Sequence, residues 1–244
     1  MSQITTVIFD MYETLVEEDP SQWQGTFQGI IRRQHLDVDP EVLSKVWWEQ
    51  MGKFRDSRAD PAAPFQTYFQ GWRDTFAGAF EQLGLPGDPD TATKESFQDI
   101  SQRPPFEETH KALRLIQARC RTAILSNADD DYLRPNLDLL ENDIVAALSA
   151  VLTSEEARCY KPHPAFFHEM LRRLGVTPQE CLYVGDRQLE DVKGAKGVGM
   201  GTIWINRSKK AMDPQLPAPD HQINSLLEIP ELLDRISGRK DGAQ

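Results

Sequence analysis

The sequence predicts an α/β protein built on a doubly wound parallel β-sheet, with a helical cap domain inserted after the first strand. Three observations lead to this fold class. Short apolar runs of strand length recur along the chain, helix-length segments separate the later runs, and a long interval without strands follows the first run. Continuous apolar strands that alternate with helices are typical of a parallel sheet that helices cover on both faces.

Five apolar runs are predicted to form the strands of this sheet. Helix-like segments lie between the later runs, at residues 107–118 and 164–175. The second segment begins at Pro164 and ends at Gly175, and both residue types favour helix boundaries at these places. The predicted strands are Thr6–Phe9, Thr122–Ser126, Ala150–Leu152, Cys181–Val184 and Gly201–Ile205.

The interval between the first and second strands is predicted to form the inserted helical domain. Stretches rich in Pro and Asp, such as residues 58–64, separate its helices. We therefore expect an α/β core made of residues 1–16 and 104–238, a helical cap made of residues 17–103, and a frayed tail at residues 238–244. The predicted cap helices are residues 21–35, 40–54, 64–83 and 91–101.

Most of the Trp and Phe residues of the chain lie in this predicted cap. They either pack a small core within the cap or, for a few of them, line a cavity above the sheet. The set comprises Trp23, Phe27, Trp47, Trp48, Phe54, Phe65, Phe69, Trp72, Phe76, Phe80 and Phe97.

Composition and charge narrow the possible partners. The formal net charge is −11 and the pI is about 5.0, which argues against binding to the phosphate backbone of nucleic acids. No apolar stretch approaches the roughly 20 residues of a membrane span, and the N-terminus does not resemble a signal peptide. The three cysteines lack the spacing of a disulfide framework or a zinc site. We expect a cytoplasmic protein, a monomer or a homodimer, with a small-molecule substrate.

Polar side chains follow four of the predicted strands at the point where each strand ends. Ligands of open α/β sheets bind outside the carboxyl ends of the strands, so these side chains are the candidate site. In chain order, they are Asp10 and Thr14, Ser126 and Asn127, Lys161, and Asp186 and Asp191.

Four sequence motifs carry a resemblance to a known family. The stretches "FDMYETL", "LSN", "KPHPAFF" and "VGDRQLEDVKGAKGVGM" occur in this order along the chain, each at a predicted strand end. Together they resemble the motifs of the haloacid dehalogenase-like (HAD) hydrolase superfamily. The predicted helical insert corresponds to the cap that one subfamily carries between its first two motifs.

The resemblance implies roles for individual residues. Asp10 corresponds to the nucleophile, which forms an ester intermediate and so divides one displacement into two steps. Ser126 is expected to donate a hydrogen bond to an anionic oxygen of the substrate, and Lys161 to stabilise developing negative charge. Thr14 and Asp191 complete the expected catalytic set. Asn127 is expected to contact the substrate.

Three consecutive aspartates, Asp129, Asp130 and Asp131, follow Asn127. We interpret them as helix capping and solvated charge rather than as part of the chemistry.

Tyr12 stands where the family's phosphatases carry a second aspartate that acts as general acid and base. The family's dehalogenases resemble D-x-Y-G-T, which Tyr12 fits, although Glu13 replaces the glycine. Tyr12 is therefore a candidate substrate-binding residue. A tyrosine can donate a proton but is a poor base at neutral pH.

Asp186 favours the phosphatase type, because the dehalogenases typically carry small uncharged serines at its position. Asp10, Asp186 and Asp191 are expected to converge with only Lys161 to balance them, and such a cluster raises a pKa or recruits a cation. By resemblance, Asp10, the backbone carbonyl of Tyr12 and Asp186 would bind Mg²⁺, which prefers oxygen ligands.

The sequence leaves three functions open. The first is Mg²⁺-dependent hydrolysis of phosphoryl esters with good leaving groups, through an aspartyl ester on Asp10. The second is metal-independent 2-haloacid dehalogenation. Trp47 and Trp48 stand near the place where that subfamily carries a halide-binding arginine, but Arg32, Arg33, Arg55 or Arg58 could take that role. The third is a catalytically weak binding module of the same fold.

Overall fold

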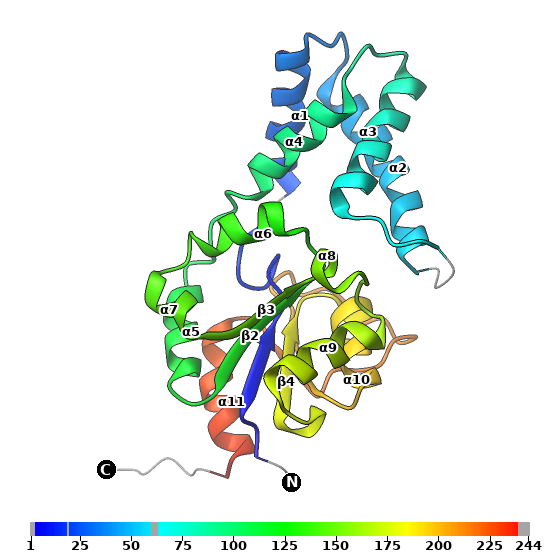
Figure 1. Cartoon of the computed structure of the whole chain (residues 1–244). Coiled ribbons are helices and arrows are strands. Elements are labelled where there is room, and N and C mark those ends of the chain that lie inside the picture. Colours follow the sequence, from blue (N-terminus) through cyan, green and yellow to red (C-terminus); the bar gives the residue numbers. More distant parts are fainter. Residues whose placement is uncertain (1–2, 19, 60–62, 239–244) are drawn as a thin grey trace. The chain divides into compact units, whose positions relative to one another are not determined.

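A computed structural model describes residues 3–18, 20–59 and 63–238. It shows a parallel sheet of six strands in the order β3-β2-β1-β4-β5-β6. The sheet and its helices form the Rossmann-like α/β fold that the sequence predicts (Figure 1). The strands are β1 Thr6–Phe9, β2 Arg121–Ser126, β3 Leu148–Thr153, β4 Cys181–Gly185, β5 Gly201–Ile205 and β6 His221–Ile223.

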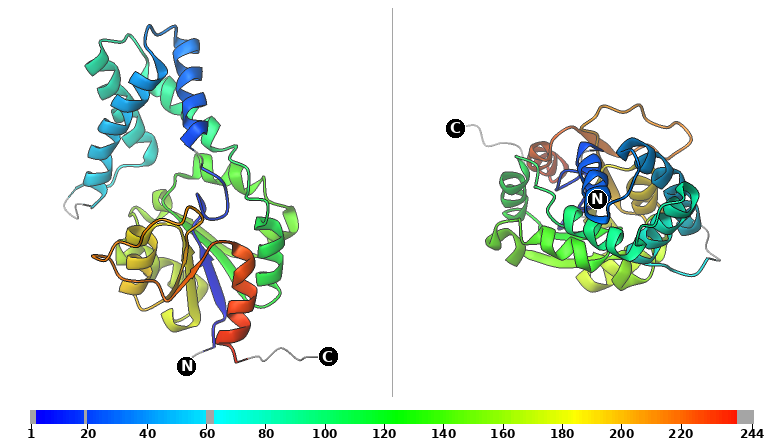
Figure 2. Two further views of the ribbon diagram at one scale, coloured as in Figure 1. Left: turned by 180° about the vertical axis from the view of Figure 1, so that it is seen from behind. Right: turned by 90° about the horizontal axis from the view of Figure 1, so that it is seen from above.

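Helices cover both faces of this sheet. Figures 1 and 2 show α9 and α10 on one face and α5 and α11 on the other. The face below α9 and α10 holds a closely packed apolar core that includes Ile8, Leu125 and Phe167. The helices of this part are α5 Thr109–Gln117, α7 Asn142–Ala146, α8 Ser154–Ala157, α9 Pro164–Leu174, α10 Gly194–Gly197 and α11 Ile229–Ile236. A π-helical turn at Gln188–Lys193 and 3₁₀ turns at Pro178–Glu180 and Leu226–Glu228 complete it.

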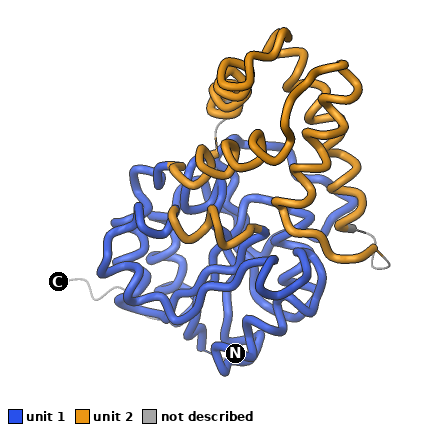
Figure 3. Tube along the Cα trace, turned by 45° about the horizontal axis from the view of Figure 1, so that its top comes forward, with its two compact units in different colours: residues 1–17, 104–127, 136–244 blue, residues 18–103, 128–135 orange. Residues whose placement is uncertain are grey.

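The chain divides into two compact units (Figure 3). We call the first, residues 1–17, 104–127 and 136–244, the α/β unit. The second, residues 18–103 and 128–135, is the helical unit. Its helices are α1 Pro20–Gln34, α2 Pro40–Ala59, α3 Tyr68–Leu83 and α4 Pro89–Ile100, and α6 Asp130–Leu137 begins in it.

Aromatic side chains form the interior of the helical unit. Trp47 and Phe27 are fully buried, and Trp23 and Trp72 are nearly so. The ring of Trp47 lies within 5.1 to 5.8 Å of the rings of these three residues, centroid to centroid. Such tilted and edge-to-face pairs add to the stabilisation that burial of apolar area provides. These aromatic residues therefore pack a core of the helical unit itself.

The structure also contains elements that the sequence analysis did not identify. The edge strand β6 has three residues, and α7 and α8 have five and four. Elements this short show too few periods for a hydrophobic pattern to be recognised. The separator at residues 58–64 and the tail at residues 238–244 fall partly outside the described residues, so those expectations stay predictions.

Candidate active site

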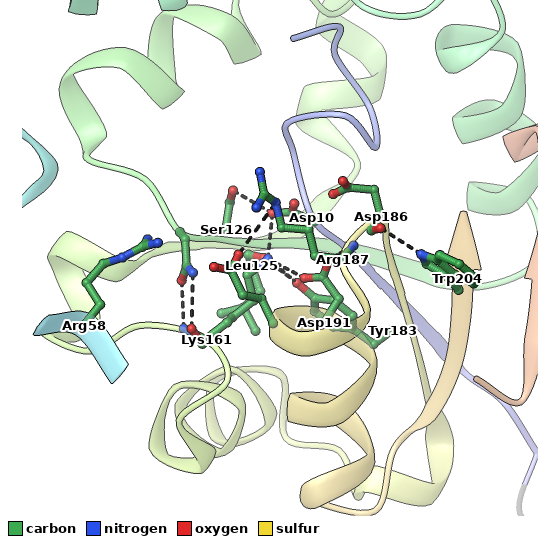
Figure 4. Close-up of polar contacts among 12 residues, drawn as sticks. Asp10, Arg58, Leu125, Ser126, Lys161, Tyr183, Asp186, Arg187, Asp191 and Trp204 are labelled. Carbon is green, nitrogen blue, oxygen red and sulfur yellow. Dashed lines mark hydrogen bonds and ion pairs between the residues drawn. The ribbon is translucent and has the colours of Figure 1, made fainter. Parts of the chain in front are cut away.

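The register of the sheet brings the ends of three strands to one level. Phe9, the last residue of β1, pairs with Ile124 of β2 on one side and Val184 of β4 on the other. Asp10 directly follows the end of β1, and β2 ends at Ser126. Polar residues from β1, β2 and β4 therefore meet at the carboxyl edge of the sheet, as Figure 4 shows.

Asp10 is buried and is held by one of its two carboxylate oxygens. Its Oδ1 accepts a hydrogen bond from Ser126 Oγ at 2.7 Å and lies 2.8 Å from Lys161 Nζ. Its Oδ2 accepts no hydrogen bond from the residues that the structure describes. This arrangement fixes the orientation of the carboxylate and leaves one oxygen available to attack a substrate or bind a cation.

Lys161 is a buried cation at the centre of the site. Its Nζ lies 2.6 Å from Asp191 Oδ1 and donates to Tyr183 Oη at 3.0 Å, in addition to its contact with Asp10. Burial alone would lower the pKa of Lys161, but the charges of Asp10 and Asp191 raise it well above its ordinary value. The neighbouring carboxylates therefore favour the protonated, positively charged form of Lys161.

Tyr183 is a site residue that the sequence analysis missed. It lies on β4, fully buried, and its hydroxyl donates to the carbonyl oxygen of Leu125 at 2.8 Å while it accepts from Lys161. A buried tyrosine hydroxyl almost always needs a partner. A tyrosine within an otherwise apolar predicted strand was the signal that could have identified it.

Asp186 and Asp191 bring two further carboxylates to Asp10. One oxygen from each of the three residues lies within 4.8 Å of the others. Burial raises the pKa of Asp191 to about 6, although the charge of Lys161 opposes this rise. Burial and the nearby charge of Asp191 raise the pKa of Asp186 as well.

Close packing at the end of β4 fixes the position of Asp191. A Cβ atom added to Gly185 would lie 2.3 Å from the Asp191 carboxylate, so this position requires glycine. Asp191 Oδ2 also accepts a hydrogen bond from the backbone N–H of Arg187 at 2.8 Å. Both oxygens of Asp191 are therefore engaged by the protein.

Tyr12 and Asn127 make contacts within the protein. Tyr12 is buried, and its hydroxyl oxygen accepts a hydrogen bond from Asn136 Nδ2 at 2.9 Å. The Asn127 side chain accepts from the backbone N–H of Lys161 at 2.8 Å and donates to the carbonyl oxygen of Lys161 at 3.4 Å. Asn127 therefore holds the backbone of Lys161, and its expected substrate contact stays a prediction.

The loop after β1 contains Glu13 in a left-handed conformation, with φ at 58°. This conformation explains why the related motif has glycine there, because residues with a Cβ rarely adopt it. The next residue, Thr14, is fully buried, and its hydroxyl has no hydrogen-bond partner among the described residues. Arg207 Nη2 donates to the carbonyl oxygen of Thr14 at 3.0 Å, so the loop is also held from the segment after β5.

The acidic cluster has the chemistry of a site for a hard cation. Neither Asp10 Oδ2 nor the Asp186 carboxylate accepts a hydrogen bond from the described residues, and Asp191 lies close by. Magnesium prefers such carboxylate oxygens and retains several waters. Lys161 provides one positive charge beside three carboxyl groups. The residues present therefore fit a divalent cation.

The fold and the polar strand ends define a Rossmann-like α/β protein with an acidic site at the carboxyl edge of its sheet. A family model for haloacid dehalogenase-like hydrolases matches residues 4–199. The chain belongs to this family, as the sequence motifs predict. Within the described residues, no helix has both the length and the apolar character needed to cross a membrane.

Relatives of this chain include both kinds of hydrolase considered above. The chain is 27% identical to (S)-2-haloacid dehalogenase 1 of Pseudomonas sp. (strain CBS-3) over 240 residues, which cover 97% of the chain and all of that protein. It is 31% identical to N-acylneuraminate-9-phosphatase of Rattus norvegicus over 246 residues, 97% of the chain and 96% of the phosphatase. The fold is similar to that of the HAD hydrolase YfnB of Bacillus subtilis, solved bound to magnesium, with a TM-score of 0.77, 16% identity, and coverage of 96% and 100%.

Proposed function

We propose that this hydrolase cleaves a phosphoryl ester of a small molecule, with Asp10 as nucleophile and Mg²⁺ as cofactor. The observation that carries the proposal is the cluster of Asp10, Asp186 and Asp191 within 4.8 Å. Two unit charges at this distance repel by about 3.5 kcal/mol at an effective dielectric constant of about 20. A cation relieves that repulsion, and a substrate carboxylate would add to it.

The reaction follows from the orientation of Asp10. Its Oδ2 attacks phosphorus in line with the leaving oxygen, the bond from phosphorus to that oxygen breaks, and an aspartyl phosphate forms. Water then attacks phosphorus, which releases phosphate and restores the Asp10 carboxylate. Lys161 and Ser126 keep Oδ1 in place throughout.

Magnesium would be held by the Asp10 carboxylate, Asp186 and the backbone carbonyl of Tyr12. It would supply positive charge that stabilises the oxygens of the transferring phosphoryl group. Asp191, with both oxygens engaged by Lys161 and the Arg187 backbone, would act on these ligands from outside the coordination shell.

The position of Tyr12 favours substrates with good leaving groups. General acid catalysis is worth about 10²–10⁴ in rate, and this chain has Tyr12 where the related phosphatases carry an acid. The Tyr12 ring is buried and its hydroxyl oxygen is occupied by Asn136. Acyl or aryl phosphates, whose leaving oxygens need no proton, are therefore the preferred substrate class.

The helical unit is proposed to act as a cap over this chemistry. Caps of this kind admit substrate when open and exclude water when closed. Its aromatic core gives it a rigidity of its own, since Trp23, Trp47 and Trp72 pack on one another.

Haloacid dehalogenation is the second candidate, favoured by Tyr12 and by similarity to the Pseudomonas dehalogenase. In that reaction Asp10 would attack the carbon that bears the halogen and displace halide. Two observations count against it. The negative charge of a haloacid would meet Asp186 and Asp191, and Trp47, near the place expected for a halide-binding arginine, is buried among aromatic rings.

A side-by-side assay of the wild-type chain distinguishes these reactions. We expect Mg²⁺-dependent phosphate release from a series of aryl phosphates, with rates that rise as the pKa of the leaving group falls, and loss of activity with a chelator. Halide release from 2-chloropropionate that a chelator leaves unchanged would instead establish the dehalogenase.

Replacing Asp186 tests the metal site directly. In Asp186→Asn the metal loses a charged ligand, so the Mg²⁺ concentration for half-maximal phosphatase activity should rise by about 10- to 100-fold. Asp138→Asn, which removes a charge at an exposed position of the α/β unit, is the matched control and should behave as wild type. An unchanged Mg²⁺ requirement in Asp186→Asn would refute the proposed ligand set.

A further inference from the structure

The segment 128–135 leaves the α/β unit directly after the site and returns beside it. Ser126 and Asn127 belong to the α/β unit, the eight residues of segment 128–135 belong to the helical unit, and Asn136 belongs to the α/β unit again. Figure 3 shows this segment in the colour of the helical unit. A short piece of the helical unit is thus joined at both ends to residues of the candidate site.

Asp129 attaches this segment to the helical unit. Its carboxylate is buried and accepts hydrogen bonds from the first two backbone N–H groups of α3, Tyr68 N at 2.9 Å and Phe69 N at 2.7 Å. A carboxylate at a helix N-terminus also interacts favourably with the helix dipole. The sequence analysis expected capping and solvated charge for this run; Asp129 does cap a helix, but one 60 residues away, and it is buried rather than solvated.

Tyr132 strengthens the same attachment. It is buried, its ring stacks on Trp72 with centroids 6.1 Å apart, and it meets Phe97 edge-to-face at 4.8 Å. These contacts join segment 128–135 to α3 and α4 by apolar packing in addition to the two charged hydrogen bonds. The segment is therefore attached to the helical unit by both polar and apolar contacts.

The connection from Asp129 back to the site is short. Two residues, Asn127 and Ala128, separate Ser126 from Asp129, so the Cα atoms of Ser126 and Asp129 can lie at most about 11 Å apart. At the start of this connection, Ser126 donates a hydrogen bond to Asp10. The next residue, Asn127, accepts a hydrogen bond from the backbone N–H of Lys161. At the other end, Asn136 donates to the Tyr12 hydroxyl.

We infer that Asp129 is a positioning residue, through which the helical unit sets the placement of Ser126, and with it the orientation of the Asp10 carboxylate. This inference rests on Asp10 as the nucleophile of the proposed function, but not on the identity of the leaving group. A misplacement of a catalytic group by about 1 Å can lower a rate by about 10²-fold. A small displacement of Ser126, caused by loss of the Asp129 hydrogen bonds, would therefore be sufficient to affect catalysis.

The test is a double-mutant cycle measured on the full chain. Asp129→Asn replaces one acceptor oxygen by an amide group that repels an N–H of α3. We expect kcat/KM for Mg²⁺-dependent hydrolysis of an aryl phosphate to fall by roughly 10- to 100-fold. In a Ser126→Ala background, where the hydroxyl that Asp129 positions is already absent, the same substitution should lower kcat/KM less than about threefold. Asp131→Asn, an equal change of charge at an exposed position of the same segment, is the matched control and should retain wild-type activity.

Two further measurements separate positioning from damage to the fold. Asp129→Glu keeps the carboxylate and should recover activity relative to Asp129→Asn, and thermal unfolding should show that each variant remains folded at the assay temperature. Equal losses in the wild-type and Ser126→Ala backgrounds would overturn the inference, as would full activity of Asp129→Asn. Failure of the proposed function would differ from both, since the wild-type chain itself would then not hydrolyse the phosphates in the presence of Mg²⁺.

Discussion

The two compact units of this molecule bury different kinds of side chain. At the carboxyl edge of the sheet, the α/β unit buries Asp10, Lys161 and Asp191. The positive charge of Lys161 forms ion pairs with both carboxylates. The helical unit buries aromatic rings such as Trp47 and Phe27, which contact each other directly. Buried charges contribute little net stability but define a site, whereas buried aromatic rings stabilise a fold. Substitutions at the buried charges of the α/β unit should therefore mainly reduce activity, whereas substitutions of the buried rings of the helical unit should mainly reduce stability.

The largest effect on stability is expected in the helical unit. Trp47→Ala removes a fully buried ring, and substitutions of this kind cost about 3–5 kcal/mol. The fluorescence change on urea unfolding reports mainly on this unit, because four of the five tryptophans lie in it and only Trp204 lies outside. Amide hydrogen exchange of the β-strands should change much less.

Trp48→Ala is the matched control for this comparison. Trp48 is 38% exposed and touches the rings of Trp23 and Trp47 from outside, so its loss should cost about 1 kcal/mol. If the two variants unfolded at the same urea concentration, the helical unit would not depend on its buried aromatic core.

The second effect is expected in the acidic cluster and depends on pH. Because burial raises the pKa of Asp191 to about 6 and also raises that of Asp186, the folded chain without metal binds more protons than the unfolded chain from about pH 4 upward. The chain without metal therefore loses part of its stability as the pH rises through the pKa of Asp191, about 6, and through the raised pKa of Asp186. If the proposed site binds Mg²⁺ through the ionised carboxylates, the cation should restore this stability, by about 2.7 kcal/mol at a hundredfold excess over Kd.

Thermal unfolding with and without Mg²⁺ at pH 5 and pH 8 measures this difference. The increase in unfolding temperature on adding Mg²⁺ should be larger at pH 8 than at pH 5 and should be absent in Asp186→Asn. Equal increases at both pH values would show that the cation binds elsewhere.

The smallest effect is expected in the loop after β1. Glu13→Gly relieves a left-handed backbone conformation, and we expect a gain of about 0.5–1 kcal/mol in the free energy of unfolding. Glu17→Gly, four residues on and without a positive φ, should instead destabilise the chain by a similar amount. A loss of stability in Glu13→Gly would mean that the contacts of the Glu13 side chain outweigh the strain of its backbone.

The sequence predicts the core of this fold well because a parallel sheet imposes a strong local pattern. The first strand, Thr6–Phe9, and the fifth, Gly201–Ile205, have the same bounds in the predicted and observed sheets. The polar residues at the strand ends were predictable for the same reason, since ligands of such sheets bind at that edge.

Contacts between distant parts of the chain could not be predicted in the same way. Asp129 caps α3, whose first residues lie about 60 positions earlier in the chain, and Tyr183 contacts Lys161, 22 positions earlier. The local sequence around Asp129 or Tyr183 does not indicate these distant partners. Asn127 likewise has the residue type of a substrate ligand, and its hydrogen bonds to the Lys161 backbone become visible only when the strand ends are assembled.

The surroundings of Lys161 have a consequence for how the substrate is recognised. A lysine ammonium carries three hydrogens, and contacts with Asp10, Asp191 and Tyr183 account for all of them. Lys161 can thus attract an incoming anion through space but has no hydrogen left to offer it. Selectivity among anions must come from other donors, so exchanging this lysine would alter the speed of turnover rather than the choice of compound.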